Sequence, residues 1–135
     1  MKSEIVRLDV STAAREQLID ITTRVQQALT TMGARDGMIT VFVPHTTAGV
    51  TINENADPDV VHDILLALDK AVPAQSRFRH GEGNSTAHVK SSLVGSSLQA
   101  LVQNGRLVLG TWQGIYFCEF DGPRNRQLLV QATID

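Results

Sequence analysis

Two segments of the sequence concentrate side chains that could do chemistry. The first, His45 to Asp57, holds an imidazole, three hydroxyls, two amides and two carboxylates within 13 residues, and its polar character continues to Asp59. The second, His80 to Lys90, adds two histidines and two glycines. Loops at the ends of elements, held by a rigid scaffold, commonly carry function. We therefore expect the site in these two segments.

Three of the four histidines, His45, His80 and His88, fall inside the two segments, and His62 is expected on a solvated helix face. Three imidazoles brought together could bind a transition metal with an open coordination position. One of them could instead act as general acid or base near neutral pH. No histidine spacing matches a standard zinc motif, so both interpretations stay open.

Other residues of the two segments have more local roles. His45 and Glu54 have no evident structural task, which favours function, whereas Asp57 is explained as a helix cap. The glycines beside His80 allow backbone N–H groups to approach a ligand. The helix start that follows suits an anion, and Lys90 could neutralise a phosphate.

Three later residues are weaker candidates. Trp112, the only tryptophan, stands between glycines and either lines a pocket or packs in the core. Arg124 lies in an expected turn, where it either binds phosphate or is solvated. Cys118 is expected to be a small buried residue rather than a nucleophile.

Size and composition restrict the class of protein. A chain of 135 residues fits one domain, and a formal charge of −2 argues against a nucleic-acid partner. No apolar stretch is long enough for a membrane span, and the N-terminus does not resemble a signal peptide. The single cysteine excludes an internal disulfide. These features predict a cytoplasmic protein.

The elements expected to position these residues follow from periodicity and turn signals. Helices are expected from about Asp20 to Gly33, from Asp57 to Val72 and from about Asn84 to Val94. Strands are expected at 4–10, 37–44, 49–53, 98–102, 106–109, 114–120 and 127–134. The second helix should bury a stripe that includes Val61, Leu65 and Leu68.

The last 40 residues read as strands joined by turns. Asn104-Gly105 is a strong hairpin signal, and Asp121-Gly122-Pro123 marks another turn. We therefore expect mostly an antiparallel meander here. Because helices and strands do not alternate strictly, the chain is α+β with about three helices, not doubly wound.

The assembled motifs resemble one known family, the YjbQ family, formerly an uncharacterised protein family. The resemblance runs in order over nearly the whole chain, so residues 1–135 are expected to form a single YjbQ-like domain. The matching motifs are His45-Thr46-Thr47-Ala48, 52–59, 81–84, 87–90, 105–113 and Asp121-Gly122-Pro123-Arg124.

The resemblance implies a compact, sandwich-like α+β fold with a largely antiparallel sheet, and a homotrimer. It also implies secondary thiamine-phosphate synthase activity, which joins an aminopyrimidine methyl diphosphate to a thiazole phosphate and releases pyrophosphate. Carried over, the catalytic residues are His45, Glu54 and His88. A divalent metal ion, Mg or Zn, would be held by His45, His80 and His88.

In such a reaction the departing diphosphate needs stabilising charge, and two flat rings need positioning. The residues expected to bind the phosphorylated substrates are Thr46, Asn55, Gly83, Asn84, Lys90, Trp112 and Arg124. Two alternatives use the same residues. One is a metal-dependent hydrolase of a small phosphorylated or heterocyclic metabolite, and the other is a non-catalytic small-molecule binding protein.

Overall fold

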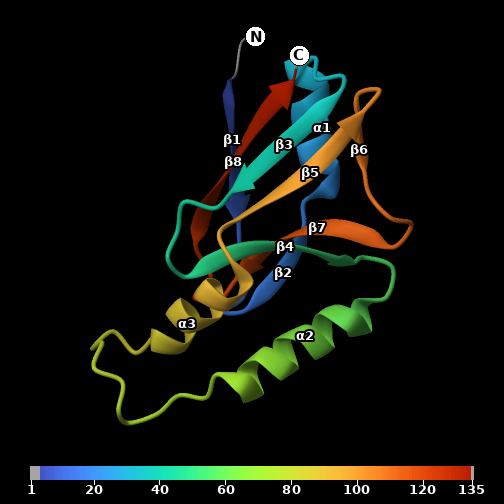
Figure 1. Cartoon of the computed structure of the whole chain (residues 1–135). Helices are drawn as coiled ribbons and strands as arrows, with labels where there is room; N and C mark the ends of the chain where they lie inside the picture. Colours follow the sequence, from blue (N-terminus) through green and yellow to red (C-terminus); the bar gives the residue numbers. More distant parts are fainter. Residues whose placement is uncertain (1–3, 135) are drawn as a thin grey trace.

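The computed structural model describes residues 4–134, which form eight strands and three helices (Figure 1). The strands are β1 (Ile5–Ser11), β2 (Gln17–Asp20), β3 (Gly37–Phe42), β4 (Ala48–Glu54), β5 (Ser97–Gln103), β6 (Arg106–Val108), β7 (Gln113–Glu119) and β8 (Asn125–Ile134). The helices are α1 (Thr22–Met32), α2 (Pro58–Ala71) and α3 (Ser85–Val94).

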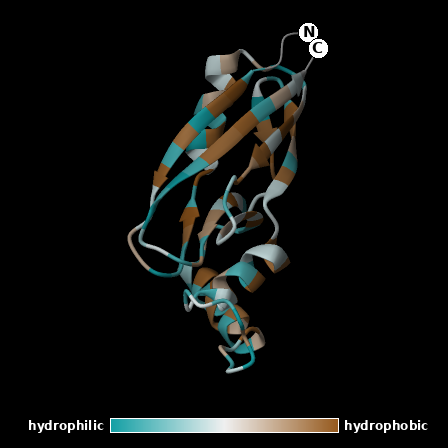
Figure 2. Cartoon of the chain, turned by 90° about the vertical axis from the view of Figure 1, so that its left-hand side faces the viewer, coloured by the Kyte–Doolittle hydropathy of each residue, from teal (hydrophilic) through white to brown (hydrophobic). Residues whose placement is uncertain are grey.

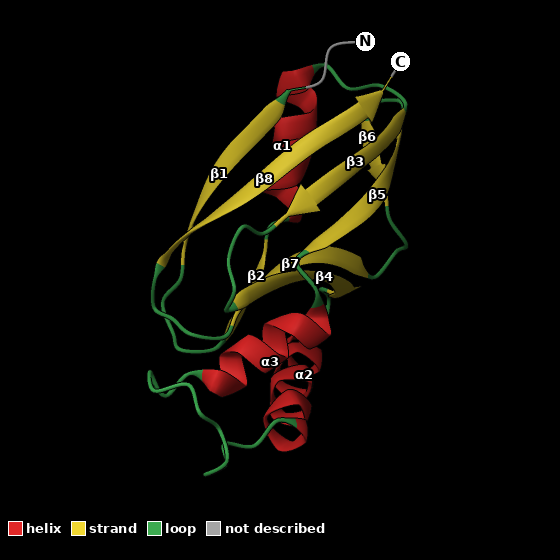
Figure 3. Ribbon diagram, turned by 60° about the vertical axis from the view of Figure 1, so that its left-hand side comes forward, coloured by secondary structure: helices red, strands yellow, loops and turns green. Residues whose placement is uncertain are grey.

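The strands form two antiparallel sheets, which confirms the predicted α+β class. The larger sheet has the order β1-β8-β3-β5-β6, and the smaller has the order β2-β7-β4. In Figure 3 the smaller sheet lies below the larger one, α1 lies behind the larger sheet, and α2 and α3 lie beyond the smaller sheet.

The main core lies between the two sheets and α1. Leu29 of α1, Val130 of β8 and Phe117 of β7 are all fully buried in it. Apolar and polar residues alternate along the strands, as the colours of Figure 2 show, because successive side chains point to opposite faces of a sheet. This alternation directs one face of each sheet into the shared core.

A second apolar cluster lies on the other face of the smaller sheet. Tyr116, Cys118 and Phe120 are buried there with Ala87 of α3. The expected stripe of α2, which includes Val61, Leu65 and Leu68, packs against this cluster but is only partly buried. Strand β7 therefore has apolar layers on both faces.

Most helix boundaries predicted from capping residues in the sequence are confirmed by the structure. Asp57 caps α2 by accepting a hydrogen bond from the Asp59 backbone N–H at 2.9 Å, and Pro58 occupies the first turn. The expected cap at Asp20 is off by one residue. Ile21 holds the N-cap position, although the Asp20 carboxylate still accepts the Thr22 N–H at 3.0 Å.

The expected C-terminal meander is wrong in one respect. Strands β5 and β6 form the hairpin around Asn104-Gly105, but β7 and β8 belong to different sheets. Strand β7 is the central strand of the smaller sheet and is buried on both faces, and the turn after Phe120 crosses between the sheets.

Among residues 4–134, no helix is long and apolar enough to span a membrane.

A buried ion pair joins the two sheets at the end of the main core. The Arg126 guanidinium of β8 contacts both carboxylate oxygens of Glu119 on β7. Thr12 donates its hydroxyl to the same carboxylate at 2.7 Å, and the Asp121 N–H donates at 3.0 Å. Burial opposes ionisation of Glu119, but its hydrogen bonds with Arg126, Asp121 and Thr12 lower its pKa below the ordinary value.

We expect Arg126→Met to lower the free energy of unfolding by about 3–5 kcal/mol, because it leaves the Glu119 carboxylate buried without its cation. The double variant Glu119→Leu/Arg126→Met removes both charges and should lose less than the sum of the two single variants. Denaturant unfolding of the four proteins measures this coupling. Additive losses would show that the pair contributes no interaction energy.

Candidate functional site

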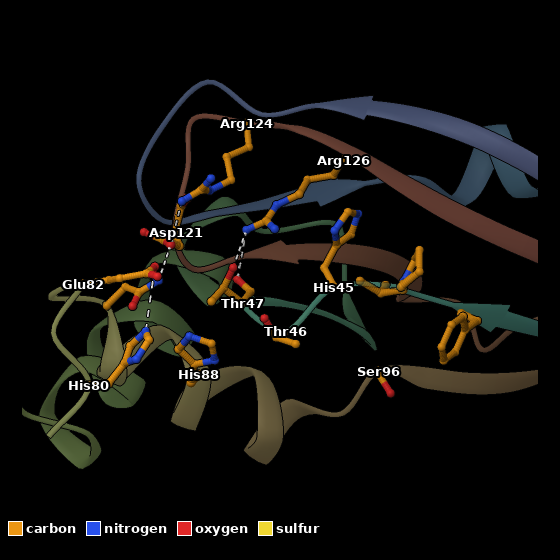
Figure 4. Close-up of a pocket in the computed structure, with 14 residues that line it drawn as sticks. His45, Thr46, Thr47, His80, Glu82, His88, Ser96, Asp121, Arg124 and Arg126 are labelled. Carbon is orange, nitrogen blue, oxygen red and sulfur yellow. Dashed lines mark hydrogen bonds and ion pairs between the residues drawn. The ribbon is translucent and has the colours of Figure 1, made fainter. Parts of the chain in front are cut away.

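A cleft of about 670 Å³ lies where both sheets meet α3 (Figure 4). Its walls come from the segment after β3, the segment between α2 and α3, α3 itself and the turn between β7 and β8. A second cavity of about 400 Å³ shares His45, Thr46, His88 and Ser96 with it. The lining residues of the cleft are 42–47, His80, Glu82, Asn84, His88, Ser96, Asp121, Arg124 and Arg126.

His45 is held by the backbone of β8, an inner strand of the larger sheet. Strand β3 ends at Phe42, which pairs with Leu129 of β8. The backbone N–H of Gln127, two residues before Leu129, donates to the His45 Nε2 at 2.9 Å. A ring nitrogen that accepts a hydrogen bond carries no proton, so the other nitrogen, Nδ1, is protonated in the neutral ring. Burial, and then the charge of Arg126, lower the pKa of His45 below its ordinary value. The fold thus favours a neutral imidazole.

The buried ion pair positions the residues next to His45. The Arg126 Nη2 donates to the Thr47 hydroxyl at 2.8 Å and to the Thr47 carbonyl at 3.3 Å. Its Nη1 has no hydrogen-bond partner among residues 4–134, although Arg126 lines the cleft and is only 5% exposed. Arg126 therefore anchors one wall and offers one more N–H group to the cleft.

His80 and His88 face each other on the opposite side of the cleft. Their ring centroids are 5.2 Å apart at an interplanar angle of 87°, an edge-to-face contact. The Nε2 of His80 lies 3.8 Å from the Glu82 carboxylate. The ring nitrogens of His88 have no hydrogen-bond partner within the described chain. His88 is thus available to a ligand.

A group around Asp121 closes the remaining wall. Asn84 at the start of α3 donates its Nδ2 to Asp121 at 2.8 Å, and Arg124 pairs with the same carboxylate oxygen at 3.0 Å. Burial works against ionisation, but these hydrogen bonds lower the pKa of Asp121. Because the Asn84 side chain bonds to Asp121, it does not cap α3.

The charges of the cleft are balanced. Two arginines, Arg124 and Arg126, line it together with two carboxylates, Glu82 and Asp121. Each arginine is already paired, Arg124 with Asp121 and Arg126 with the buried Glu119. The cleft therefore offers directional N–H and imidazole groups rather than a large excess of positive charge.

The structure brings only part of the predicted site together. His45, Thr46, His80, Asn84, His88 and Arg124 line the cleft, and Gly83 lies between two lining residues with a positive φ of 79°. Lys90 does not take part. Its Nζ donates to Glu16 at 2.7 Å and to Asp69 at 3.1 Å, and its side chain is 3% exposed. It cannot reach a phosphate in the cleft.

Three further candidates lie at the far end of β4. Glu54 and Asn55 follow six residues of extended strand from Ala48, which corresponds to about 20 Å. The Asn55 N–H donates to the Trp112 carbonyl at 2.9 Å, so Trp112 belongs to the same end, and it is 62% exposed. None of the three lines the cleft, so they are unsuited to substrate binding there.

The histidines do not assemble into a metal centre within one chain. No three His, Cys, Asp or Glu side chains of residues 4–134 are grouped to hold a metal ion. His45 is held at β8 by its Nε2, whereas His80 and His88 contact each other. The described residues of one chain therefore do not fit the predicted three-histidine site, and a bound divalent cation stays a prediction.

The sequence interpretation missed Arg126 and Glu119. A signal for each was present, because Arg126 shares its strand face with the apolar Leu128 and Val130, and Glu119 interrupts a buried apolar run. A charged residue on a buried strand face needs a partner of opposite charge. Pairing the two would have indicated a buried contact between strands.

An α+β domain of two antiparallel sheets, with a histidine-lined cleft at their junction, is thus the class of protein that the structure defines. The chain belongs to the YjbQ-like family: the sequence model described as "UPF0047 protein YjbQ-like" matches residues 6–135. The UPF0047 protein YugU of Bacillus subtilis is 53% identical, over 92% of this chain and 95% of YugU. A UPF0047 protein of Methanocaldococcus jannaschii is 50% identical, over 97% of this chain and 95% of its own length.

Solved structures show the same fold. A YjbQ/UPF0047 family protein of Clostridium acetobutylicum is 55% identical with a TM-score of 0.92, covering 95% of this chain and 99% of that one. A protein of Sulfolobus solfataricus, described as YbjQ-like and of unknown function, is 32% identical with a TM-score of 0.93, covering 99% of each chain.

These relatives overturn the expected function. They are named only as UPF0047 or YjbQ-like proteins, and none of these names supports thiamine-phosphate synthase activity. The hydrolase and binding-protein alternatives receive no support from them either. The structure gives physical reasons against the synthase: Lys90 is sequestered, Trp112 lies elsewhere, and the balanced cleft charge is unsuited to a diphosphate.

The lowered pKa of His45 predicts a pH dependence of stability. The unfolded chain binds a proton at His45 near pH 6.5, while the folded chain resists it, so the stability contributed by neutral His45 is lost as pH falls below 6.5. We expect His45→Gln to reduce this acid sensitivity, because Gln offers an acceptor for the Gln127 N–H without titrating.

Denaturation midpoints of the wild type and His45→Gln at pH 7.5 and 5.0 measure the effect. His45→Ala, which removes both the acceptor and the titrating group, separates the two contributions. Identical pH dependence of all three proteins would contradict the assignment.

Proposed function

We propose that the cleft is the active site of an enzyme that catalyses proton transfer on a small polar metabolite carrying at most one negative charge. The observation that carries the proposal is the presence of His45, held neutral, and of His88, with free ring nitrogens, on the walls of one cleft. Imidazole is the side chain best suited to proton transfer near neutral pH.

His45 serves as the hydrogen-bond donor that polarises an oxygen of the substrate. Its Nε2 is occupied by the Gln127 N–H, so a ligand meets the Nδ1–H, which no residue of the described range accepts. In the view of Figure 4, Thr46 and Thr47 lie between His45 and His88. A ligand that contacts both imidazoles thus crosses this threonine segment.

His88 serves as the base. Its neighbour His80 contacts it edge-on, and Glu82 lies near the other side of His80. The ring nitrogens of His88 have no hydrogen-bond partner among residues 4–134, so one of them can accept a proton from a ligand.

The charge balance of the cleft restricts the substrate. Arg124 and Arg126 are both paired, so the remaining N–H groups can orient one oxyanion without neutralising a multiply charged ligand. A singly charged or neutral polar metabolite therefore fits the site better than a diphosphate.

The proposal is tested with a panel of small polar metabolites incubated with the protein in D2O and followed by proton NMR. We expect loss of C–H signals or new product signals for at least one compound of low charge. His88→Asn should slow that reaction by about 10²-fold or more, the usual contribution of a general base. His45→Ala, which removes the N–H donor, should slow it by about 10²-fold.

His62→Asn is the matched control, because His62 is exposed and bonds only to its neighbour Asp63. The proposal is wrong if His88→Asn retains the full rate. It is also wrong if only compounds with two or more negative charges react.

We also propose a homotrimer, a divalent cation and a cytoplasmic location, as the sequence led us to expect. The outer face of the larger sheet supports self-association, because Phe42, Leu101 and Val108 are exposed large apolar residues on its strands. Because one chain does not group three metal ligands, a cation would require ligands beyond those that its described residues bring together.

Light scattering on the purified protein tests the trimer. Three chains of 14.7 kDa give about 44 kDa, and Leu101→Asp, on the exposed sheet face, should lower this mass. Elemental analysis of the same sample tests for bound Zn or Mg. A monomer of 14.7 kDa at all protein concentrations would contradict the trimer.

A further inference from the structure

Helix α2 is the longest helix in the described chain, yet none of its 14 residues is fully buried. Its apolar side chains Val61, Leu65 and Leu68 touch the second apolar cluster but stay partly exposed. Most of the stability of a helix in a protein comes from packing of its apolar face. Weak burial therefore makes α2 an element that can separate at low cost in free energy.

The surface under α2 is apolar. Three side chains point toward α2 and α3: Tyr116 and Cys118 of β7, and Phe120, which follows the strand. All three are nearly inaccessible to solvent. The opposite face of the same strand, with Ile115 and Phe117, belongs to the main core between the sheets. Loss of α2 would uncover the part of this face that α3 does not cover and would leave the other face packed.

A polar contact holds α2 in place. Lys90 of α3 donates its Nζ to Asp69 of α2 at 3.1 Å, and also to Glu16 at 2.7 Å. Asp69 lies near the C-terminal end of α2, where the helix dipole disfavours a negative charge. The Lys90 ammonium offsets this unfavourable position. Solvent reaches only the carboxylate partner of this ion pair, because the Asp69 side chain is 70% exposed and the Lys90 side chain only 3%.

We propose that α2 is a hinged cover that lifts from β7 while both sheets stay folded, and that the Asp69–Lys90 contact is its latch. The cover also reaches the cleft. Residues 72–84 connect α2 to α3, and His80 and Glu82 of this connection line the cleft. Opening therefore releases one wall of the cleft. This inference does not depend on the chemistry proposed for the site.

Cys118, the only cysteine of the chain, reports the opening. Burial raises the pKa of its thiol to about 12, so the closed protein presents essentially no thiolate at neutral pH. Labelling of the native full chain with a thiol reagent such as Ellman's reagent then proceeds through the open form. Its rate should be proportional to reagent concentration and should measure the population of that form.

The decisive comparison uses two substitutions on α2 that remove the same charge. Asp69→Asn breaks the latch and should raise the labelling rate about three- to fivefold, the range expected for one partly exposed ion pair. Asp63→Asn is the control, because Asp63 is exposed and contacts only His62. It should leave the rate unchanged. Equal rates for the two variants overturn the latch.

A second control separates local opening from global unfolding. Val25→Ala creates a cavity in the main core, where Val25 is fully buried, and lowers global stability without touching α2. If α2 opens independently, this variant labels Cys118 at the wild-type rate. A labelling rate that rises in step with the loss of global stability overturns the cover, because Cys118 is then reached only through unfolding of the whole domain.

Discussion

The buried pair of Glu119 and Arg126 is the interaction on which the rest of the structure depends. It joins β7 of one sheet to β8 of the other, and it is satisfied by Thr12, Thr47 and the backbone after β7. Two charges at the end of an apolar core are tolerated because both carboxylate oxygens of Glu119 accept hydrogen bonds and Arg126 donates to Thr47 as well. The place where the sheets are joined is also the place where the cleft opens.

The cleft consequently has one rigid wall and one adaptable wall. His45 sits on the rigid side, where its imidazole takes the N–H of Gln127 beyond the end of β3 and Arg126 holds the adjoining Thr47. His80 and Glu82 sit on the other side, in the exposed connection from α2. An adaptable wall beside His88 would let a substrate enter before His80 and Glu82 settle against it.

Local features of this chain were predictable, and long-range ones were not. The cap at Asp57-Pro58 and the turn at Asn104-Gly105 depend on neighbours in sequence, so the sequence alone indicated them. Glu54 was assigned to the site because it has no evident structural task and matches a motif of the family, but a strand carries it about 20 Å away. The partners of Lys90 lie 74 and 21 residues distant, and no local pattern reveals them.

Family membership and site chemistry answer different questions here. The relatives share the fold and much of the sequence, but a shared fold supports many activities. The restriction on chemistry comes from the charges: each arginine of the cleft is paired with a carboxylate, and the neutral state of His45 is imposed by burial and by Arg126. A site built in this way discriminates by placing hydrogen-bond donors and acceptors, not by attracting charge. Proton transfer on a weakly charged molecule is the chemistry that such a site can accelerate.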